Sequence, residues 1–400
     1  MHDIIIMKGG KMISFKYKDI YNKFIDSYKK IHINPFHEIS EYELETIYNE
    51  LVNSMDITDD YTFYYFMNYI IKRLSGKSDA HTKLDMVYVL PINFKIFDNE
   101  VFANYPDNLR GANLKYINGI SIDNIISEMD NVITYGTLGK RRYELEKGLF
   151  NRRMMFGLPS LKDSDSLIYE FITLNGQPKI IKFDKNKTER EEKPFDYNMY
   201  LYGDTGKYEF IDDILIYRHS SVQSQFKDKI EKAIETLEKE DLSQIKSIII
   251  DLRGNTGGNS RLNKLLIDFL KKHNDKKLIC LTDYRIFSAG RYALIDLISL
   301  GAITIGEEIS TPINCYGESN WVLFDKYSFS ISGCYFDPSI NYSSRNKDDF
   351  LKTKTDEILK SHIFKPDIYV EQSREDFIKG NDTILDYAIN YCKEQNRTLN

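Results

Sequence analysis

The 400-residue sequence predicts a mixed α/β protein in which a helical segment and a β-rich segment precede a larger α/β domain. Apolar residues recur at helical spacing near the N-terminus, short strands with tight turns follow, and buried strands then alternate with amphipathic helices. We therefore expect three domains: a helical segment over 1–76, a β-rich module over 77–185 and an α/β domain over 195–400.

Three helices are expected in the first segment. Residues 17–31 and 61–74 each carry an apolar stripe with the period of a helix. Between them, Ser40 and Glu43 form a capping box at the start of a third helix over residues 43–52.

Turn signals organise the β-rich module. A strand is expected at 86–91, a hairpin turns at Asp98-Asn99, and Asn118-Gly119 follows the next strand. The Asn175-Gly176 pair predicts a further hairpin, because both residues adopt the positive φ values that a two-residue turn needs. Residues 184–194 are charged and aperiodic, which is typical of a solvated loop or linker.

The remaining residues predict a sheet covered on both faces. Its strands are apolar throughout and are separated by helices, which is the pattern of a parallel sheet. The expected strands are 213–218, 247–252, 277–283 and 302–308, with helices at 223–239, 261–273 and 291–300 between them. Two more strand segments, 321–324 and 329–336, and a closing helix at 382–395 complete the chain.

Composition excludes several classes of protein. A net charge of −6 with interleaved lysines and acids gives no basic face for nucleic acid. The apolar run at the N-terminus is too short for a signal peptide and no later run spans a membrane, so a cytoplasmic location is expected. The four cysteines form no CxxC pair, so neither a zinc site nor a disulfide framework is expected, and nothing suggests another metal or a cofactor.

A glycine-rich loop, residues 254–259, follows the apolar strand at 247–252. Its spacing matches neither the dinucleotide nor the P-loop motif, and Gly76-Lys77-Ser78 lacks the first glycine of a P-loop because Ile71 stands there. Nucleotide binding is therefore not expected. The loop is either a simple tight turn or a place where backbone N–H groups face a ligand.

Ser288 precedes the helix that follows the next strand. A serine there is usually an ordinary N-cap, but the same position has unpaired N–H groups and the positive end of a helix dipole, which suit an oxyanion. The glycines of the neighbouring loop would let a second N–H approach. A nucleophilic serine needs a base, and His81, at a helix-to-strand junction, is a candidate, although a lone histidine is more often structural.

Five motifs together resemble the C-terminal-processing (tail-specific) protease family of serine peptidases. In order, they are SDAHTKL, IIIDLRGNTGG, FSAGRYA, AITIGEEISTPINCYGE and IFKPDIYVEQSREDFIKGNDTILDYA. The match is closer to the tricorn-like, histidine-containing bacterial branch than to the Ser-Lys branch, because the segment that carries the lysine base in the latter has none here. The resemblance implies a crotonase-like (ClpP/crotonase ββα) catalytic domain and a PDZ-like middle module.

The resemblance also implies the roles of single residues. Ser288 would be the nucleophile and His81 the general base, with Glu318 as the acid that orients it and Glu357 as the alternative. The oxyanion hole would use the N–H of Ala289 and that of Gly257 or Gly258. The substrate would be a peptide or protein; the oligomeric state, including a homo-oligomer, is left open.

Departures from the family pattern keep other functions open. Gly290-Arg291 replaces a glutamate, Ala80 replaces a glycine, and the segment EEIST lacks the usual TGG. These changes could mark a catalytically inactive peptide-binding or scaffold protein. An esterase is a second alternative; because the chain has no GxSxG motif, such an esterase would have to use this same site. A crotonase-type acyl-CoA enzyme is a third.

Overall fold

A computed structural model describes the chain except residues 1–3, 7–10, 86–88, 187–203, 338–361 and 398–400. The fold is mixed α/β, as predicted, and forms two compact units. The first unit consists of Met1–Gly136, Arg141–Phe195 and Cys315–Phe336; the second consists of Thr137–Lys140, Asp196–Asn314 and Asp337–Asn400. The three predicted domain boundaries, the crotonase-like class and the PDZ-like class stay predictions.

A six-stranded sheet forms the centre of the second unit, in the order β10-β11-β12-β13-β14-β17. The strands from β11 to β17 run parallel, as their uninterrupted apolar sequences predict, and only β10 is antiparallel to its neighbour. Their bounds are β10 Tyr208–Ile211, β11 Ile214–Arg218, β12 Ser247–Asp251, β13 Lys277–Thr282, β14 Ile303–Gly306 and β17 Ile368–Tyr369.

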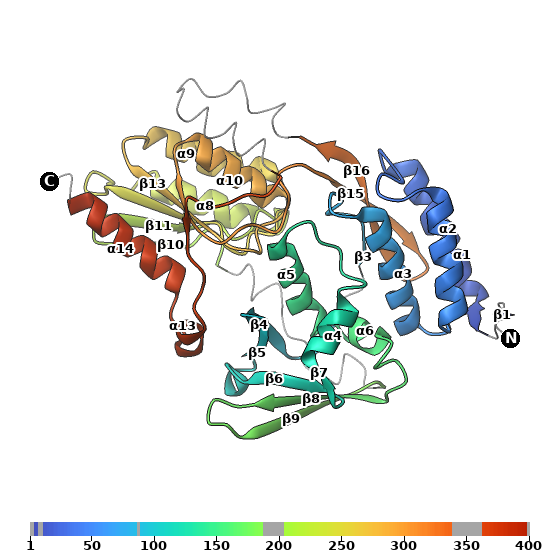
Figure 1. Ribbon diagram of the computed structural model, residues 1–400. Helices are drawn as coiled ribbons and strands as arrows, with labels where there is room; N and C mark the ends of the chain where they lie inside the picture. The colour runs from blue at the N-terminus through green and yellow to red at the C-terminus, as the bar shows by residue number, and fades with distance from the viewer. Residues whose placement is uncertain (1–3, 7–10, 86–88, 187–203, 338–361, 398–400) are drawn as a thin grey trace. The chain divides into compact units, whose positions relative to one another are not determined.

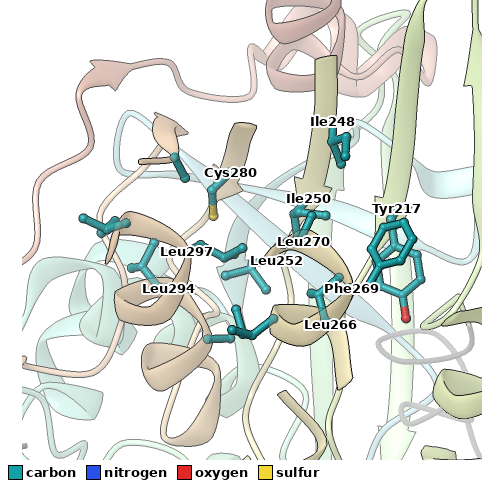
Figure 2. Packing of buried hydrophobic residues seen from close by; sticks show 14 of the residues in the cluster. Tyr217, Ile248, Ile250, Leu252, Leu266, Phe269, Leu270, Cys280, Leu294 and Leu297 are labelled. Atoms are coloured by element: carbon teal, nitrogen blue, oxygen red, sulfur yellow. The ribbon is translucent and has the colours of Figure 1, made fainter. Parts of the chain in front are cut away.

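Helices cover both faces of this sheet (Figure 1). On one face, Ile250 and Leu252 pack with Leu266 and Leu297 in the apolar layer that Figure 2 shows. On the other face, Ile249 packs with residues of the C-terminal helix, because successive strand residues point to opposite sides. The helices of the unit are α8 Lys227–Leu237, α9 Asn263–Lys272, α10 Ala289–Ser299, α13 Arg374–Lys379 and α14 Thr383–Arg397, with the short helices η2 Ser224–Phe226 and η3 Ser260–Leu262.

Three N-terminal helices and a small sheet make up one part of the first unit. The expected helices are present, and Ser40 and Glu43 form the expected capping box. Aromatic rings fill the interior: Tyr17 stacks on Phe63 with ring centroids 4.6 Å apart. The elements are α1 Phe15–Ile31, α2 Glu41–Ser54, α3 Asp60–Ser75, β1 Ile4–Ile6, β2 Met12–Ser14 and the sheet β15-β16-β3, with β15 Cys315–Phe324, β16 Tyr327–Phe336 and β3 Lys83–Asp85.

The other part of the first unit is a sheet in the order β4-β5-β6-β8-β9, with β7 paired to β6. The expected hairpin joins β8 to β9, but its loop spans residues 173–177 rather than two residues, and of the pair Asn175-Gly176 only Gly176 has a positive φ, +77°. The elements are β4 Asn93–Phe97, β5 Glu100–Tyr105, β6 Asn113–Ile117, β7 Ile120–Ser121, β8 Ser166–Ile172, β9 Pro178–Asp184, η1 Asp107–Leu109, α4 Ile122–Met129, α5 Leu138–Gly148 and α6 Arg152–Gly157.

Two local predictions differ from the structure. The strand expected over residues 86–91 lies partly outside the described residues, and the observed strand β3 precedes it at Lys83–Asp85. Helices α5 and α6 were not predicted, because LGKRRYELEKG shows no apolar stripe and α6 is only one and a half turns long. Within the described part of the chain, no helix has the length and apolar content needed to cross a membrane.

Candidate active site

The candidate nucleophile lies at one edge of the six-stranded sheet in the second unit. Strands β11 to β14 are parallel, so the loops that follow them emerge at the same edge. These loops carry the residues of the candidate site: His219 after β11, Asn255 and Gly257 after β12, Ser288 after β13 and Thr311 after β14.

Ser288 precedes α10, as predicted, but it is not an ordinary N-cap. Its backbone has φ 52° and ψ −118°, a region that non-glycine residues avoid, and its side chain makes no capping hydrogen bond. Ser373 before α13 shows the ordinary arrangement: its φ is −73° and its Oγ accepts a hydrogen bond from Asp376 N at 3.1 Å. Strained backbone of this kind concentrates at functional sites, which makes Ser288 a candidate site residue.

The backbone of Ser288 is fixed from the loop after β14. Its N–H donates to Thr311 Oγ1 at 2.8 Å, and the Ser310 side chain and N–H both donate to the Ile286 carbonyl. Thr311 belongs to the EEIST segment whose departure from the family pattern raised doubt about activity. The altered segment therefore still supplies a residue, Thr311, that accepts a hydrogen bond from the backbone of Ser288.

Gly257 lies directly against the nucleophile. It has φ +97°, and a Cβ placed there would stand 2.8 Å from both Ser288 Cβ and Ala289 N. Its own N–H donates to Asn255 Oδ1 at 3.0 Å. Within the described residues, neither the N–H of Gly258 nor that of Ala289, the first residue of α10, donates a hydrogen bond. Of the two candidate glycines, Gly258 therefore has the available donor.

Asn255 was not predicted as a site residue, although its position two residues before Gly257 suits an Asn side chain that bonds nearby backbone. It is fully buried. Its Nδ2 donates to the His219 carbonyl at 2.7 Å, and its carbonyl accepts from Phe287 N at 2.9 Å. Asn255 thus joins the glycine loop to the segment that ends in Ser288.

Gly290 and Arg291, the other departure from the family pattern, have structural roles. A Cβ on Gly290 would lie 2.4 Å from the Asn255 carbonyl, so only glycine lets α10 approach the loop this closely. Arg291 is buried, and its Nη1 donates to the carbonyls of Pro312 and Ile313 at 3.1 and 2.8 Å. Both residues hold the loops around Ser288 in place.

His219 is a buried neutral histidine behind the site. Its Nε2 lies 3.0 Å from Asn263 Oδ1, and Asn263 Nδ2 donates to the Ala289 carbonyl at 3.0 Å. Because Nδ2 serves as this donor, Oδ1 is the acceptor and the proton of His219 is on Nε2. Burial lowers the pKa of His219 to about 4, and the hydrogen bond to Asn263 offsets this only in part.

This pKa predicts a specific acid sensitivity. Between pH 6.5 and about 4, the unfolded chain binds a proton at His219 that the folded chain does not, so the free energy of unfolding falls as pH falls. The contribution of His219 between pH 7 and pH 5 is about 2 kcal/mol. The variant His219→Gln keeps an N–H near the Nε2 position but cannot titrate. Its free energy of unfolding, measured with denaturant, should fall between pH 7 and pH 5 by about 2 kcal/mol less than that of the wild type. An unchanged difference would contradict the low pKa.

An ion-pair network fixes the start of the glycine loop. Arg253 contacts Asp251 through Nε and Nη2, both at 2.8 Å, and Asp382 through Nη1 and Nη2 at 2.6 and 2.7 Å. Burial alone would raise the pKa of Asp251, but Arg253 and Arg218 hold it well below its usual range. Since Asp382 directly precedes α14, the network connects the loop to that helix. This agrees with a structural role for Asp251 and Arg253.

His81 lies in the first unit, between α3 and β3. It is buried, and its backbone N–H donates to Asp79 Oδ1 at 3.0 Å. Its ring nitrogen Nδ1 lies 3.3 Å from the carbonyl oxygen of Tyr316. A proton on Nδ1 would face this carbonyl and leave Nε2 as the acceptor, which is the tautomer that a general base requires.

The structure describes only one of the two candidate acids, Glu318. Glu318 lies on β15, two residues after Tyr316; it is exposed and has a positive φ of 62°. Gly317 between them is close to the histidine, since a Cβ there would stand 3.1 Å from His81 Nδ1. Glu357 lies outside the described residues. Among the described residues, no group of three or more His, Cys, Asp or Glu side chains is placed to hold a metal ion.

No protein-family model matches the sequence, and no curated protein matches it. Mature CPAF, a solved structure, has a TM-score of 0.59 at 9% identity over 91% of this chain and 94% of its own. The chain shares its fold with mature CPAF.

The structure of mature CPAF complexed with lactacystin gives the same TM-score at 10% identity, over 91% of this chain and 95% of its own. The photosystem II D1 C-terminal processing protease is more distant, with a TM-score of 0.44 at 10% identity over 92% and 98%. At these identities the comparison with CPAF establishes the fold alone.

Proposed function

We propose that this protein is a serine-type peptidase with Ser288 as its nucleophile. The observation that carries the proposal is the backbone of Ser288, which is held at φ 52° at the start of α10 with a side chain that does not cap the helix. The neighbouring N–H groups of Gly258 and Ala289 support it, because they are the donors that a tetrahedral oxyanion needs. The shared fold with CPAF agrees with this reading.

In the proposed reaction, His81 Nε2 takes the proton of Ser288 Oγ while Oγ bonds to the carbonyl carbon of the substrate. The carbonyl oxygen becomes an oxyanion that Gly258 N–H and Ala289 N–H stabilise. The proton then passes from His81 to the leaving amine as the C–N bond breaks. In the second half of the reaction, His81 takes a proton from water as the water oxygen attacks the acyl ester, and returns the proton to Ser288 Oγ as the ester bond breaks. Proton transfer requires Nε2 and Oγ to come within about 2.6–3.2 Å during the reaction.

We keep Glu318 as the proposed acid that supports His81, with Glu357 as the alternative. Glu318 follows Gly317, the residue next to His81 Nδ1. As an exposed carboxylate, it would stabilise the imidazolium less than a buried one does, and the Tyr316 carbonyl would share the task of orienting the ring.

Covalent labelling tests the proposal. A fluorophosphonate probe should modify the wild-type protein at Ser288, as mass spectrometry of the peptide would show, and Ser288→Ala should not be labelled. The matched control is Ser373→Ala, which removes the ordinary N-cap before α13 and should keep full labelling. Prior incubation with lactacystin, present in one CPAF structure, should reduce labelling. A folded wild-type protein that is not labelled would support the inactive-scaffold alternative, and turnover of esters but not peptides would indicate an esterase.

A further inference from the structure

Asp79 organises the loop that carries His81. Its side chain is completely buried, and Oδ1 accepts three hydrogen bonds: from His81 N and Thr82 N at 3.0 Å each, and from Ser332 Oγ at 2.6 Å. The first two close the backbone turn around His81, and the third attaches that turn to β16. A single carboxylate oxygen therefore sets where the backbone of His81 lies.

The other oxygen of Asp79 faces a second histidine. Asp79 Oδ2 lies 3.2 Å from Nε2 of His32, whose side chain is also fully buried, although the contact is poorly aligned as a hydrogen bond. Asn34 N donates to His32 Nδ1 at 3.1 Å, so Nδ1 is the acceptor and the proton of His32 is on Nε2, facing Asp79. Burial alone would raise the pKa of Asp79, but His32, Ser332 and Thr82 hold it below its usual range.

The segment that follows α1 also contacts the residue behind the His81 ring. Asn34 Nδ2 donates to the hydroxyl of Tyr316 at 3.1 Å, and the ring of His37 lies 4.4 Å from the ring of Tyr316, centroid to centroid. The carbonyl of the same tyrosine faces His81 Nδ1. One short segment, residues 32–37, thus supports both the backbone of His81, through Asp79, and its ring, through Tyr316.

We propose that Asp79 and His32 are positioning residues that hold His81 in its catalytic geometry, so that the loop after the first N-terminal helix sets the orientation of the general base. The inference rests on the proposed function of His81. It assigns the helical segment a part in catalysis without any contact to substrate. A displacement of the base by about 1 Å can cost a hundredfold in rate, which is the effect expected when the carboxylate is lost.

Steady-state kinetics on a peptide substrate test this. Asp79→Ala should lower kcat about a hundredfold and leave KM within about threefold, because the positioned group acts on the chemical step. His32→Leu should lower kcat about tenfold, as it leaves Oδ1 of Asp79 bonded to the loop. His32→Gln carries an N–H near the place of Nε2 and should recover most of the loss. The control is Asp60→Asn, in which a carboxylate that accepts hydrogen bonds from Tyr17 and Tyr327 is changed elsewhere in the same unit, and kcat should be retained.

Hydrogen exchange gives a readout that does not depend on activity. The amides of His81 and Thr82 should exchange fastest in Asp79→Ala, which removes their acceptor, and to a smaller degree faster than in the wild type in His32→Leu, which keeps the acceptor but removes the histidine that faces the other carboxylate oxygen. They should exchange at the wild-type rate in His32→Gln and Asp60→Asn. Wild-type kcat and exchange in His32→Leu, or no recovery in His32→Gln, would overturn the inference and leave the proposed function intact. A wild type without turnover or labelling would instead overturn the function, while exchange would still report on the contact between His32 and Asp79.

Discussion

His81→Ala is expected to cleave peptides at least about 10⁴-fold more slowly than the wild type, with the loss in kcat. Removing the base of a serine peptidase leaves only substrate binding and the oxyanion donors, which together supply a small residual rate. Initial rates on an unfolded protein substrate would measure the effect. His362→Ala is a suitable control, because its exposed side chain can be removed while its carbonyl still accepts from Ile313 N.

Wild-type activity in His81→Ala would show that another residue takes the proton of Ser288. Labelling of Ser288 by the fluorophosphonate in the same variant separates two cases. Retained labelling with lost turnover would keep Ser288 as nucleophile and restrict the role of His81 to a later proton transfer. If His81 is the general base, both labelling and turnover should be lost.

Gly257→Ala is expected to lower activity more than a hundredfold. The new Cβ would stand 2.8 Å from Ser288 Cβ and Ala289 N and 2.9 Å from the Phe287 carbonyl. Ala289 N and the Phe287 carbonyl are backbone atoms, which cannot move aside as a flexible side chain can, so the glycine loop or the start of α10 must shift. Either shift moves an oxyanion donor away from its position, and one lost donor costs about 10²–10³ in kcat.

Gly380→Ala separates this steric effect from backbone strain. Gly380 also has a positive φ, +80°, and also lies in the second unit, but a Cβ there would meet nothing within 4 Å. It should lose about 1 kcal/mol of stability and keep its activity. Rates and denaturant unfolding of both variants check the comparison. Equal, small effects in the two variants would contradict the close packing of Gly257 against Ser288.

Local sequence signals predicted the second unit well. The run of apolar residues in Ser247–Asp251 and the glycines after it indicated a buried strand and its loop, and the helix expected over 291–300 corresponds to α10 Ala289–Ser299. Such features can be predicted because their signals are local in the sequence: the composition of a strand, the residues of a turn and the capping residue of a helix.

Contacts between distant residues could not be predicted in the same way. Asn34 and Tyr316 are 282 positions apart, and Asp79 and Ser332 are 253 apart, so no periodicity or spacing joins them. Thr311 supports Ser288 from the loop of another strand, and a threonine in a loop carries no signal of its own. The unusual backbone of Ser288 was also invisible, because its sequence context is that of an ordinary N-cap.

The order of the two units along the chain limits how the protein can be divided. Residues Cys315–Phe336 belong to the first unit, although they follow most of the second unit in sequence. A fragment that stops at residue 195 would therefore lack the hairpin of β15 and β16, in which β16 pairs with β3. It would also lack Tyr316 on β15 and Ser332 on β16, which contact His81 and Asp79. If the N-terminal half were expressed alone, the loop that carries His81 would lack its contacts with Tyr316 and, through Asp79, with Ser332. To reconstitute the protein from two pieces, the second piece would have to supply the β15-β16 hairpin.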